Sequence, residues 1–396
     1  MISMKKIFII IFLPVVLTAC KDIYVSPVRL PDPGYLVVEG VINSGAGNTT
    51  IKLSRTTLLT DGTRKMETGA TVVIQDENNG TYPLAESIRG EYAVNDLNLD
   101  PTRKYRLRIV TNGKEYLSDY VAVNNNPPID SISWNDTGDG VNVAVNTHDP
   151  QNTAKYFQWD YIATWEIHSD YLPGAVYDQN IPYYVYYYDP PHFWLKDTSR
   201  YKCWRTDTSR QIILGSSVKY SVDTISNLLT VIEAGSDKLT VLYSINVRQF
   251  TYTKEGYEFL QKMKKNTEQL GSVFDAQPSE LQGNIHSVSS PEEIVVGNVS
   301  ICPIQEKRVF LSSADFPNWS YSSGCYLLEE PNDSAFIKAN NFYPDGITPF
   351  ILPVDYIERN PSDPPPYGRI ITFSAAKTIC IDCRLRGSPV KPDFWP

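Results

Sequence analysis

The segment Tyr105-Arg106-Leu107-Arg108-Ile109-Val110 carries the pattern that decides the fold. Its apolar residues alternate with arginines, and alternate side chains of a β-strand face opposite sides of a sheet. Other short β-rich runs, separated by Gly, Asn and Asp turns, surround it at residues 35–42, 49–53, 71–74 and 115–123. Strands at this density predict an immunoglobulin-like β-sandwich over residues 34–124.

A polar segment closed by proline, residues 124–128, predicts a hinge and places the start of a second domain at residue 128. Residues 344–368 contain seven prolines and predict a loop, and residues 369–374 predict a last strand. Residues 128–396 are therefore expected to form a larger β-sandwich-like domain. Its other strand patterns lie at residues 129–134, 141–145, 157–165, 212–214, 230–232 and 239–250.

One segment of the second domain follows a helical period instead. Thr253 suits the N-cap position, and Gly271 lies just past the end. The sequence thus predicts a mainly β protein with a single amphipathic helix near residues 253–270. The apolar stripe of this helix consists of Tyr257, Leu260, Met263 and Leu270.

The composition supports this fold class and restricts the partners. Tyrosine occurs 26 times and methionine 4 times, which favours strands over helices. The formal net charge is −9, and it becomes −11 when a leader containing Lys5 and Lys6 is removed. Such a charge repels phosphate backbones, and the sequence has no basic cluster with interleaved aromatics. Nucleic acid is therefore not an expected partner.

The leader residues Leu17-Thr18-Ala19-Cys20 have the form of a bacterial lipoprotein signal, and a short apolar run, residues 7–17, precedes them. We expect a signal peptide over residues 1–19, a lipid on Cys20, and an extended tether over residues 20–33. Several acyl chains hold a soluble domain on a membrane, because each buried methylene contributes about 0.8 kcal/mol. The alternative is an ordinary signal peptide with an incidental cysteine.

The five other cysteines are expected to form disulfides, because an exported protein meets an oxidising compartment. Their number is odd, and we expect Cys302 to stay free, since residues 299–302 resemble a strand in which a buried thiol acts as a small hydrophobe. Cys380 and Cys383 are expected to be linked directly or through Cys325. The candidates for disulfide bonds are Cys203, Cys325, Cys380 and Cys383.

The spacing of Cys380 and Cys383 would also fit a redox pair or half of a zinc site. The four histidines lie singly along the chain and offer no second ligand pair, so no metal is predicted. A redox pair would need a βαβ context and a helix N-terminus that acidifies the first thiol. A structural staple near the C-terminus is the preferred interpretation.

An aromatic run is the most unusual constellation in the sequence. In an extended strand, residues 183–188 would place aromatic side chains on both faces of a sheet. One interpretation is an exposed platform for a sugar, a peptide or a partner surface. The other is a strand that loops or the first domain cover on both sides. The candidate binding residues are Tyr183, Tyr184, Tyr186, Tyr187, Tyr188, Trp194 and Trp204.

Catalytic signatures are missing from the sequence. It has no nucleophile elbow, no phosphate-binding glycine loop and no paired-histidine metalloprotease helix. Carboxylates are plentiful, but a β-rich glycosidase could be identified only from their geometry. No catalytic residue and no cofactor is predicted.

The end of the chain carries the most specific motif. Residues 380–387 (Cys-Ile-Asp-Cys-Arg-Leu-Arg-Gly) and 391–395 (Lys-Pro-Asp-Phe-Trp), with the lipoprotein signal and residues 35–40 and 283–285, resemble a Bacteroidota lipoprotein family, domain of unknown function 4249. The resemblance covers nearly the whole mature chain. It implies an accessory of a TonB-dependent outer-membrane receptor, and it brings no catalytic residues.

The leading hypothesis is therefore a non-enzymatic outer-membrane lipoprotein that captures a peptide or glycan ligand for a TonB-dependent transporter, or completes its assembly. Whether the protein faces the cell surface or the periplasm is left open. A structural or adhesive surface lipoprotein is the alternative. A surface hydrolase ranks third.

Overall fold

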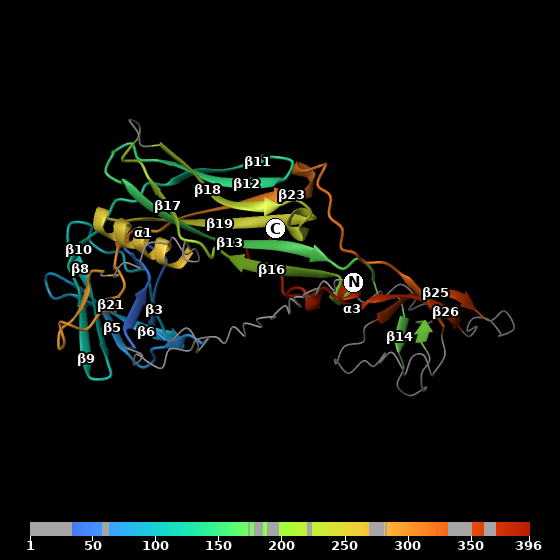
Figure 1. Cartoon of the computed structure of the whole chain (residues 1–396), viewed down its shortest axis with the longest axis horizontal. Helices are drawn as coiled ribbons and strands as arrows, with labels where there is room; N and C mark the ends of the chain where they lie inside the picture. Colours follow the sequence, from blue (N-terminus) through green and yellow to red (C-terminus); the bar gives the residue numbers. More distant parts are fainter. Residues whose placement is uncertain are drawn as a thin grey trace, which may run out of the picture.

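The structure, a computed structural model, describes residues 34–57, 63–172, 175–177, 185–187, 198–219, 224–268, 281, 283–331, 351–359 and 370–396. Figure 1 shows three β-rich parts: an N-terminal sandwich, a second sandwich, and a small C-terminal sheet beyond the end of the second sandwich. The predicted mainly β fold is confirmed. Among the described residues, no helix is long and apolar enough to cross a membrane.

The N-terminal sandwich is a sheet that folds over on itself. Its first ten strands are β1 (Leu36–Glu39), β2 (Ile42–Asn43), β3 (Asn48–Arg55), β4 (Lys65–Met66), β5 (Thr71–Asp76), β6 (Thr81–Ile88), β7 (Glu91–Asn95), β8 (Lys104–Thr111), β9 (Lys114–Ser118) and β10 (Val121–Ala122). Strand β6 passes between the two layers, because its first half pairs with β5 and its second half with β7. In β8, Tyr105, Leu107 and Ile109 are buried and the arginines between them are half-buried, as the alternation predicts.

A later segment completes this sandwich. Strand β20 (Ile285–Ser287) pairs with β9, and β21 (Val295–Val296) pairs in parallel with β1. Strand β22 (Ile301–Cys302) pairs with β2. The predicted first domain ends at residue 124, whereas the sheet of this domain includes strands from more than 150 residues later in the chain. Such short strands have no recognisable local period.

The second sandwich packs two sheets against each other. The larger sheet has the order β16-β13-β19-β23, with β17 also paired to β13, and the smaller has the order β11-β12-β18. Its core contains Trp159, Trp165 and Tyr243, which are at most 2% exposed. The strands are β11 (Ile129–Asp136), β12 (Gly140–His148), β13 (Tyr156–His168), β16 (Lys202–Thr208), β17 (Ile213–Ser216), β18 (Thr224–Glu233), β19 (Leu242–Thr251) and β23 (Gln305–Ser312).

The predicted amphipathic helix is confirmed as α1 (Lys254–Glu268). The Gly256 N–H donates to Thr253 Oγ1 at 3.2 Å, as expected for an N-cap. Tyr257 and Leu260 are buried in a cluster that includes Val41 and Val296 of the N-terminal part and Tyr156 and Leu214 of the second sandwich. Figure 1 shows α1 where the two sandwiches meet, so this helix joins them rather than covering only one.

Of the C-terminal sheet, the sequence predicts one strand, at residues 369–374, and this strand is confirmed; the other two are not predicted. The sheet has the order β24 (Leu328–Pro331), β26 (Ile370–Lys377), β25 (Ile351–Arg359). Strand β25 lies within residues 344–368, so the loop prediction is wrong there. Its Pro353 sits at a register shift on an edge strand, where a missing N–H is tolerated.

Candidate functional site

The cysteines form two disulfides, Cys203–Cys383 and Cys325–Cys380. The four candidates are therefore confirmed as a set. A direct bond between Cys380 and Cys383 is wrong, because each pairs with a different part of the chain. Cys302 is free and buried, as predicted, and burial raises the pKa of its thiol to about 11. Asp170 lies near Cys325 and Cys380, but a disulfide leaves no thiolate to bind a metal.

The C-terminal tail covers the outer face of the larger sheet beside β16. Trp204 and Ser388 exchange two backbone hydrogen bonds at 2.8 Å. The Trp395 ring lies edge-on to Trp204 and Phe310, and its Nε1–H donates to Glu166 at 3.1 Å. Trp204 is only 7% exposed, so it is buried under the tail and is not part of an exposed platform.

Glu166 is the charged centre beneath this tail. Burial alone would raise its pKa, but hydrogen bonds from Lys202, His168 and Trp395 outweigh burial and lower the pKa. The carboxylate accepts from Lys202 at 2.8 Å and His168 at 2.7 Å. Every one of these donors lies in the C-terminal tail or the sheet beneath it, so the cluster fastens the tail.

Most of the aromatic run lies outside the described residues: Tyr183, Tyr184, Tyr188 and Trp194. Tyr186 and Tyr187 belong to strand β15 (Val185–Tyr187), which pairs with β14 (Ala175–Tyr177). The interpretation of this run as a binding platform therefore stays a prediction.

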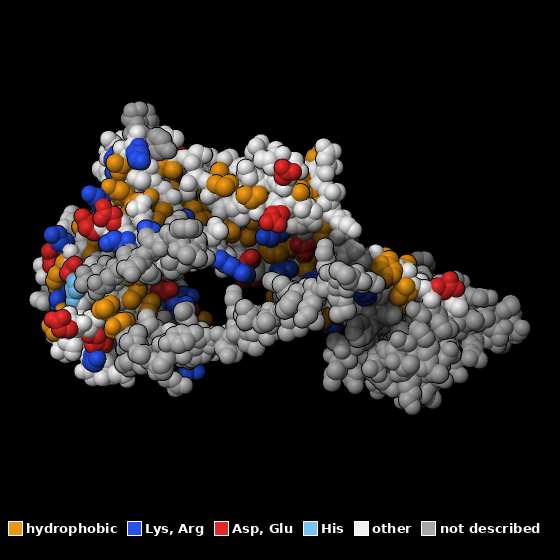
Figure 2. All heavy atoms as spheres, in the orientation of Figure 1, with side chains coloured by type: hydrophobic (Ala, Val, Ile, Leu, Met, Phe, Trp, Pro, Cys, Tyr) orange, Lys and Arg blue, Asp and Glu red, His pale blue; other side chains and the backbone are white. Residues whose placement is uncertain are grey.

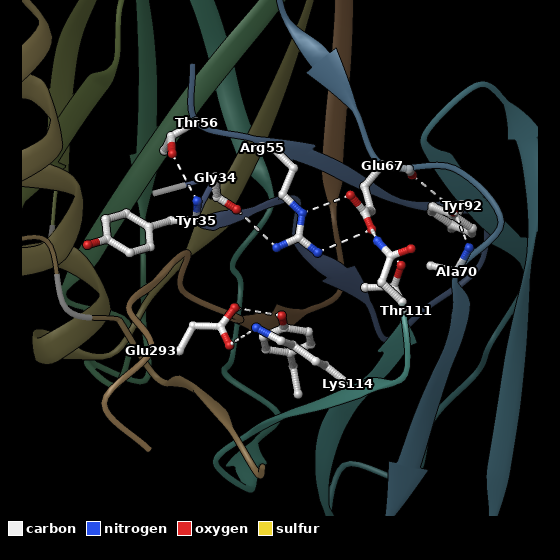
Figure 3. Close-up of polar contacts among 12 residues, drawn as sticks. Gly34, Tyr35, Arg55, Thr56, Glu67, Ala70, Tyr92, Thr111, Lys114 and Glu293 are labelled. Atoms are coloured by element: carbon white, nitrogen blue, oxygen red, sulfur yellow. Dashed lines mark hydrogen bonds and ion pairs between the residues drawn. The ribbon is translucent and has the colours of Figure 1, made fainter. Parts of the chain in front are cut away.

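A buried ion pair crosses the N-terminal sandwich (Figure 3). Arg55 Nε donates to Glu67 at 2.8 Å, and their side chains are 12% and 8% exposed. Thr111 and Asn112 also donate to Glu67, at 2.5 and 2.7 Å. The Arg55 hydrogen bond lowers the pKa of Glu67 below its ordinary range, despite burial. Arg55 also donates to the Gly34 carbonyl at 3.1 Å, where the described chain begins.

A second carboxylate ties the later segment to the same region. Glu293 accepts from Lys114 at 2.7 Å and from the Tyr116 hydroxyl at 2.8 Å, and Figure 3 places it beside Arg55. Burial would raise the pKa of Glu293, but these two hydrogen bonds lower it. Both carboxylates have their bonds filled by neighbours within the sandwich. This network of Arg55, Glu67, Lys114 and Glu293, which we call the clasp, stabilises the fold.

A groove opens along one side of the second sandwich. Its cavity volume is about 500 Å³. One wall is the edge of β18 at residues 227–231, and the other is the bend at residues 207–211 between β16 and β17. Ile213 and Leu229, which are buried, and the half-buried Tyr161 also line it.

Hydrogen bonds hold the far wall and the end of the groove. The Ser209 N–H donates to the Tyr161 carbonyl at 2.9 Å, and the Tyr161 N–H returns a bond to Ser209 Oγ at 3.2 Å. Lys264 Nζ donates to the Ile212 carbonyl at 2.7 Å, and Glu268 accepts from the Ile212 N–H at 2.6 Å. The last turns of α1 therefore fix the end of the groove.

The lining chemistry suits recognition better than acid–base work. Of the described residues that line the groove, one carries a carboxylate, Asp207, and none is a histidine or a cysteine. Asp207 lies 3.5 Å from Arg210. On the face that Figure 2 shows, basic and acidic side chains are intermixed over both sandwiches, with no large field of one sign.

Sequence reasoning missed this groove. Its walls come from residues near 161, 207–214, 227–231 and 264, which no local pattern brings together. The one feature of the groove that the sequence could have revealed is the length of β18, but the predicted strand covered only residues 230–232. The full strand of ten residues has no charged side chain before Glu233.

A family model described as Domain of unknown function (DUF4249) matches residues 23–308. No curated protein matches the chain. A solved structure, described as manganese lipoxygenase of Gaeumannomyces graminis with a partial structure of zonadhesin of Komagataella pastoris, aligns at 10% identity over 71% of this chain and 95% of that chain. The TM-score of 0.19 is too low to support any argument.

Proposed function

We propose, from the premise that the chain belongs to the domain of unknown function 4249 family, that the protein is a lipid-anchored outer-membrane lipoprotein. It has no catalytic activity, and it captures a ligand for a TonB-dependent transporter. The anchor is supported by residues 17–20, in which a cysteine follows small residues behind an apolar run. The transporter is supported by the family resemblance of residues 380–387 and 391–395.

The groove beside β18 is the observation that carries the ligand-capture part of this proposal. Its volume of about 500 Å³ falls within the range of sites that enclose small ligands. Its walls offer hydroxyl and amide groups from Thr208, Gln211 and Asn227. A glycosidase would need two carboxylates across the site, and the described lining supplies one. A purely structural or adhesive protein would need no such concavity.

The anchor is tested by replacing the cysteine. Cys20→Ala should move the protein from the membrane fraction to the soluble fraction or block its processing, because the acyl chains are lost. Thr18→Ser, which keeps the cysteine and the small-residue pattern, should leave the protein in the membrane. A processed, membrane-bound Cys20→Ala protein would contradict the anchor.

Capture is tested by purifying the lipoprotein in mild detergent and identifying what accompanies it by mass spectrometry. A TonB-dependent transporter and a bound ligand are expected. Thr230→Trp, which fills the groove, should lose the ligand and keep the transporter. Asn135→Trp, on an exposed position of β11, is the matched control and should keep both. Absence of a transporter, or retention of ligand by Thr230→Trp, would count against the proposal.

A further inference from the structure

We propose that the groove binds an extended peptide that carries a carboxylate, and that this peptide pairs with β18 as an added strand. The inference rests on the proposed function and names the ligand class of the same site. Four observations carry it: the unpaired edge of β18, the bulge at Leu229, the lining chemistry, and the charge of the rim.

No strand pairs with the second edge of β18 within the described chain, although the Asn227 side chain donates to the Leu214 carbonyl of β17 at 3.4 Å. The strand is ten residues long and pairs with β12 along its other edge. Two other edges of this sandwich are contacted by neighbouring segments. Ser388 bridges to Trp204 on β16, and Lys307 Nζ donates to the carbonyls of Ile129 and Asp130 on β11, at 3.3 and 2.6 Å. A long edge without charges or proline presents N–H and C=O groups to an extended chain.

A bulge shapes the strand at the groove. The register with β12 shifts at Leu229, which is buried, while its neighbour Leu228 is 51% exposed and Val231 is 45% exposed. Bulges often re-aim side chains next to binding sites. Here the bulge leaves two apolar side chains at the rim. Leu228 and Val231 can pack against side chains of a bound strand.

The length and lining of the groove favour a peptide over a glycan. Residues 227–231 span about 17 Å, since a strand rises about 3.3 Å per residue, so about five peptide residues fit. Sugar sites use exposed aromatic faces as platforms. Tyr161 is the one aromatic residue in the described lining, and it is half-buried against the core.

The rim of the groove is more basic than the protein as a whole. The chain carries a net charge of −9, whereas the lining has Arg210 and Lys264 against the carboxylate of Asp207. Lys264 is held by the Ile212 carbonyl and lies 3.8 Å from Glu268, so the exposed cation at the rim is Arg210. The Arg210 side chain is 85% exposed and lies 3.5 Å from Asp207. A guanidinium has five N–H donors, so it can bind a second carboxylate in a forked geometry. An acidic side chain or the C-terminal carboxylate of a peptide complements this end.

The test uses the full lipoprotein in detergent and an immobilised pool of heptapeptides of mixed sequence. Retained peptides should be enriched in acidic residues or free C-termini. Arg210→Glu should weaken the binding of an enriched peptide by about tenfold, because a charge-assisted bond is replaced by repulsion. Arg89→Glu, an exposed arginine of the N-terminal sandwich, is the matched control and should bind normally. N-methylation of alternate peptide amides should abolish binding, because those amides pair with β18.

The outcomes separate this inference from the proposed function. Equal binding by Arg210→Glu and Arg89→Glu, or tolerance of N-methylation in every register, would overturn the peptide site. Retention of maltoheptaose with no peptide retained would overturn it while leaving ligand capture standing. If no ligand is retained but a transporter co-purifies, the peptide inference fails and a role in assembly remains. Thermal unfolding of Arg210→Glu and of Arg210→Ala confirms that the fold is intact.

Discussion

The two sandwiches leave their strand edges in different states. In the N-terminal sandwich the edges are taken by β20 and β21, strands of three and two residues that return from later in the chain. Very short edge strands offer little backbone for pairing. The second sandwich ends one of its sheets in β18, which is ten residues long and has no strand along its second edge among the described residues.

The charged side chains of the two sandwiches also differ in how far they are buried and paired. Arg55 and Glu67 are buried in the N-terminal sandwich and bind each other and their neighbours. Arg210 stands at the rim of the second sandwich with its side chain 85% exposed. The N-terminal sandwich thus has its edges filled, whereas the second sandwich has an open edge, where we propose that a ligand binds.

The largest loss of stability in the N-terminal sandwich is expected when a buried charge loses its partner. Glu67→Gln should destabilise the N-terminal sandwich by about 3 kcal/mol, because the largely buried Arg55 loses its charged partner and keeps only its bond to the Gly34 carbonyl. Glu91→Gln breaks the half-exposed pair with Lys52 and should cost at most about 1 kcal/mol. Urea unfolding of both variants measures the difference. Equal losses of stability in the two variants would contradict a special role for the Arg55–Glu67 pair in stabilising the sandwich.

The disulfides should give the next largest effect. Replacing both Cys203 and Cys383 with serine should cost about 2–4 kcal/mol, because a cross-link between residues 180 apart restricts the unfolded chain. The C-terminal tail would then lose its covalent link to β16, while Cys325–Cys380 remains, and the fluorescence of Trp395 should shift towards that of an exposed indole. Denaturant unfolding followed by tryptophan emission tests both expectations. An unchanged midpoint would show that tail packing alone suffices.

Acid should lower the stability of the N-terminal sandwich by a smaller amount. The pKa of Glu67 is lowered in the folded state by its bond with Arg55. Its contribution is therefore fully present above the unfolded-state pKa of about 4.3 and is lost as the pH falls through the lower folded-state value. Stability measured between pH 6 and pH 3 should decline below about pH 4.3. The decline should be shallower in Glu67→Gln, and an identical profile would argue against this carboxylate as its source.

The groove edge should tolerate change best. Leu228→Ala should cost under about 0.5 kcal/mol, because the side chain is 51% exposed. Leu229→Ala, one residue on, should cost at least about 2 kcal/mol, because that side chain is 5% exposed in the core. Thermal unfolding of the two variants locates the boundary between rim and core. Reversed values would mean that the register at the bulge is wrong.

The sequence predicts the elements that have a strong local period. Tyr105, Leu107 and Ile109 alternate because one side of β8 is core, and Thr253 begins α1 because its hydroxyl caps an N–H. Cys302 was identified because a lone thiol in a strand-like segment behaves as a hydrophobe. In each case the information lies within one element.

The remaining features depend on contacts between distant segments. β20 and β21 are too short to show a period, and they find their places only beside β9 and β1. Pro353 suggested a loop because proline weakens a strand, yet an edge strand accepts it. The sequence placed Trp204 among the exposed aromatic candidates, but in the structure the C-terminal tail covers it. The groove combines four separate regions, so spacing along the chain could not reveal it.

The central claim is that the open edge of β18 is where this protein binds its ligand, and amide hydrogen exchange tests it most directly. The full lipoprotein would be compared with and without a peptide retained from the pool. Without peptide, outward amides of residues 227–231 should exchange faster than those of β3, whose two edges are paired. With peptide, protection should rise at residues 227–231 and stay unchanged in the N-terminal sandwich. Protection of β18 before any ligand is added, or a ligand-dependent change confined to other strands, would contradict the account.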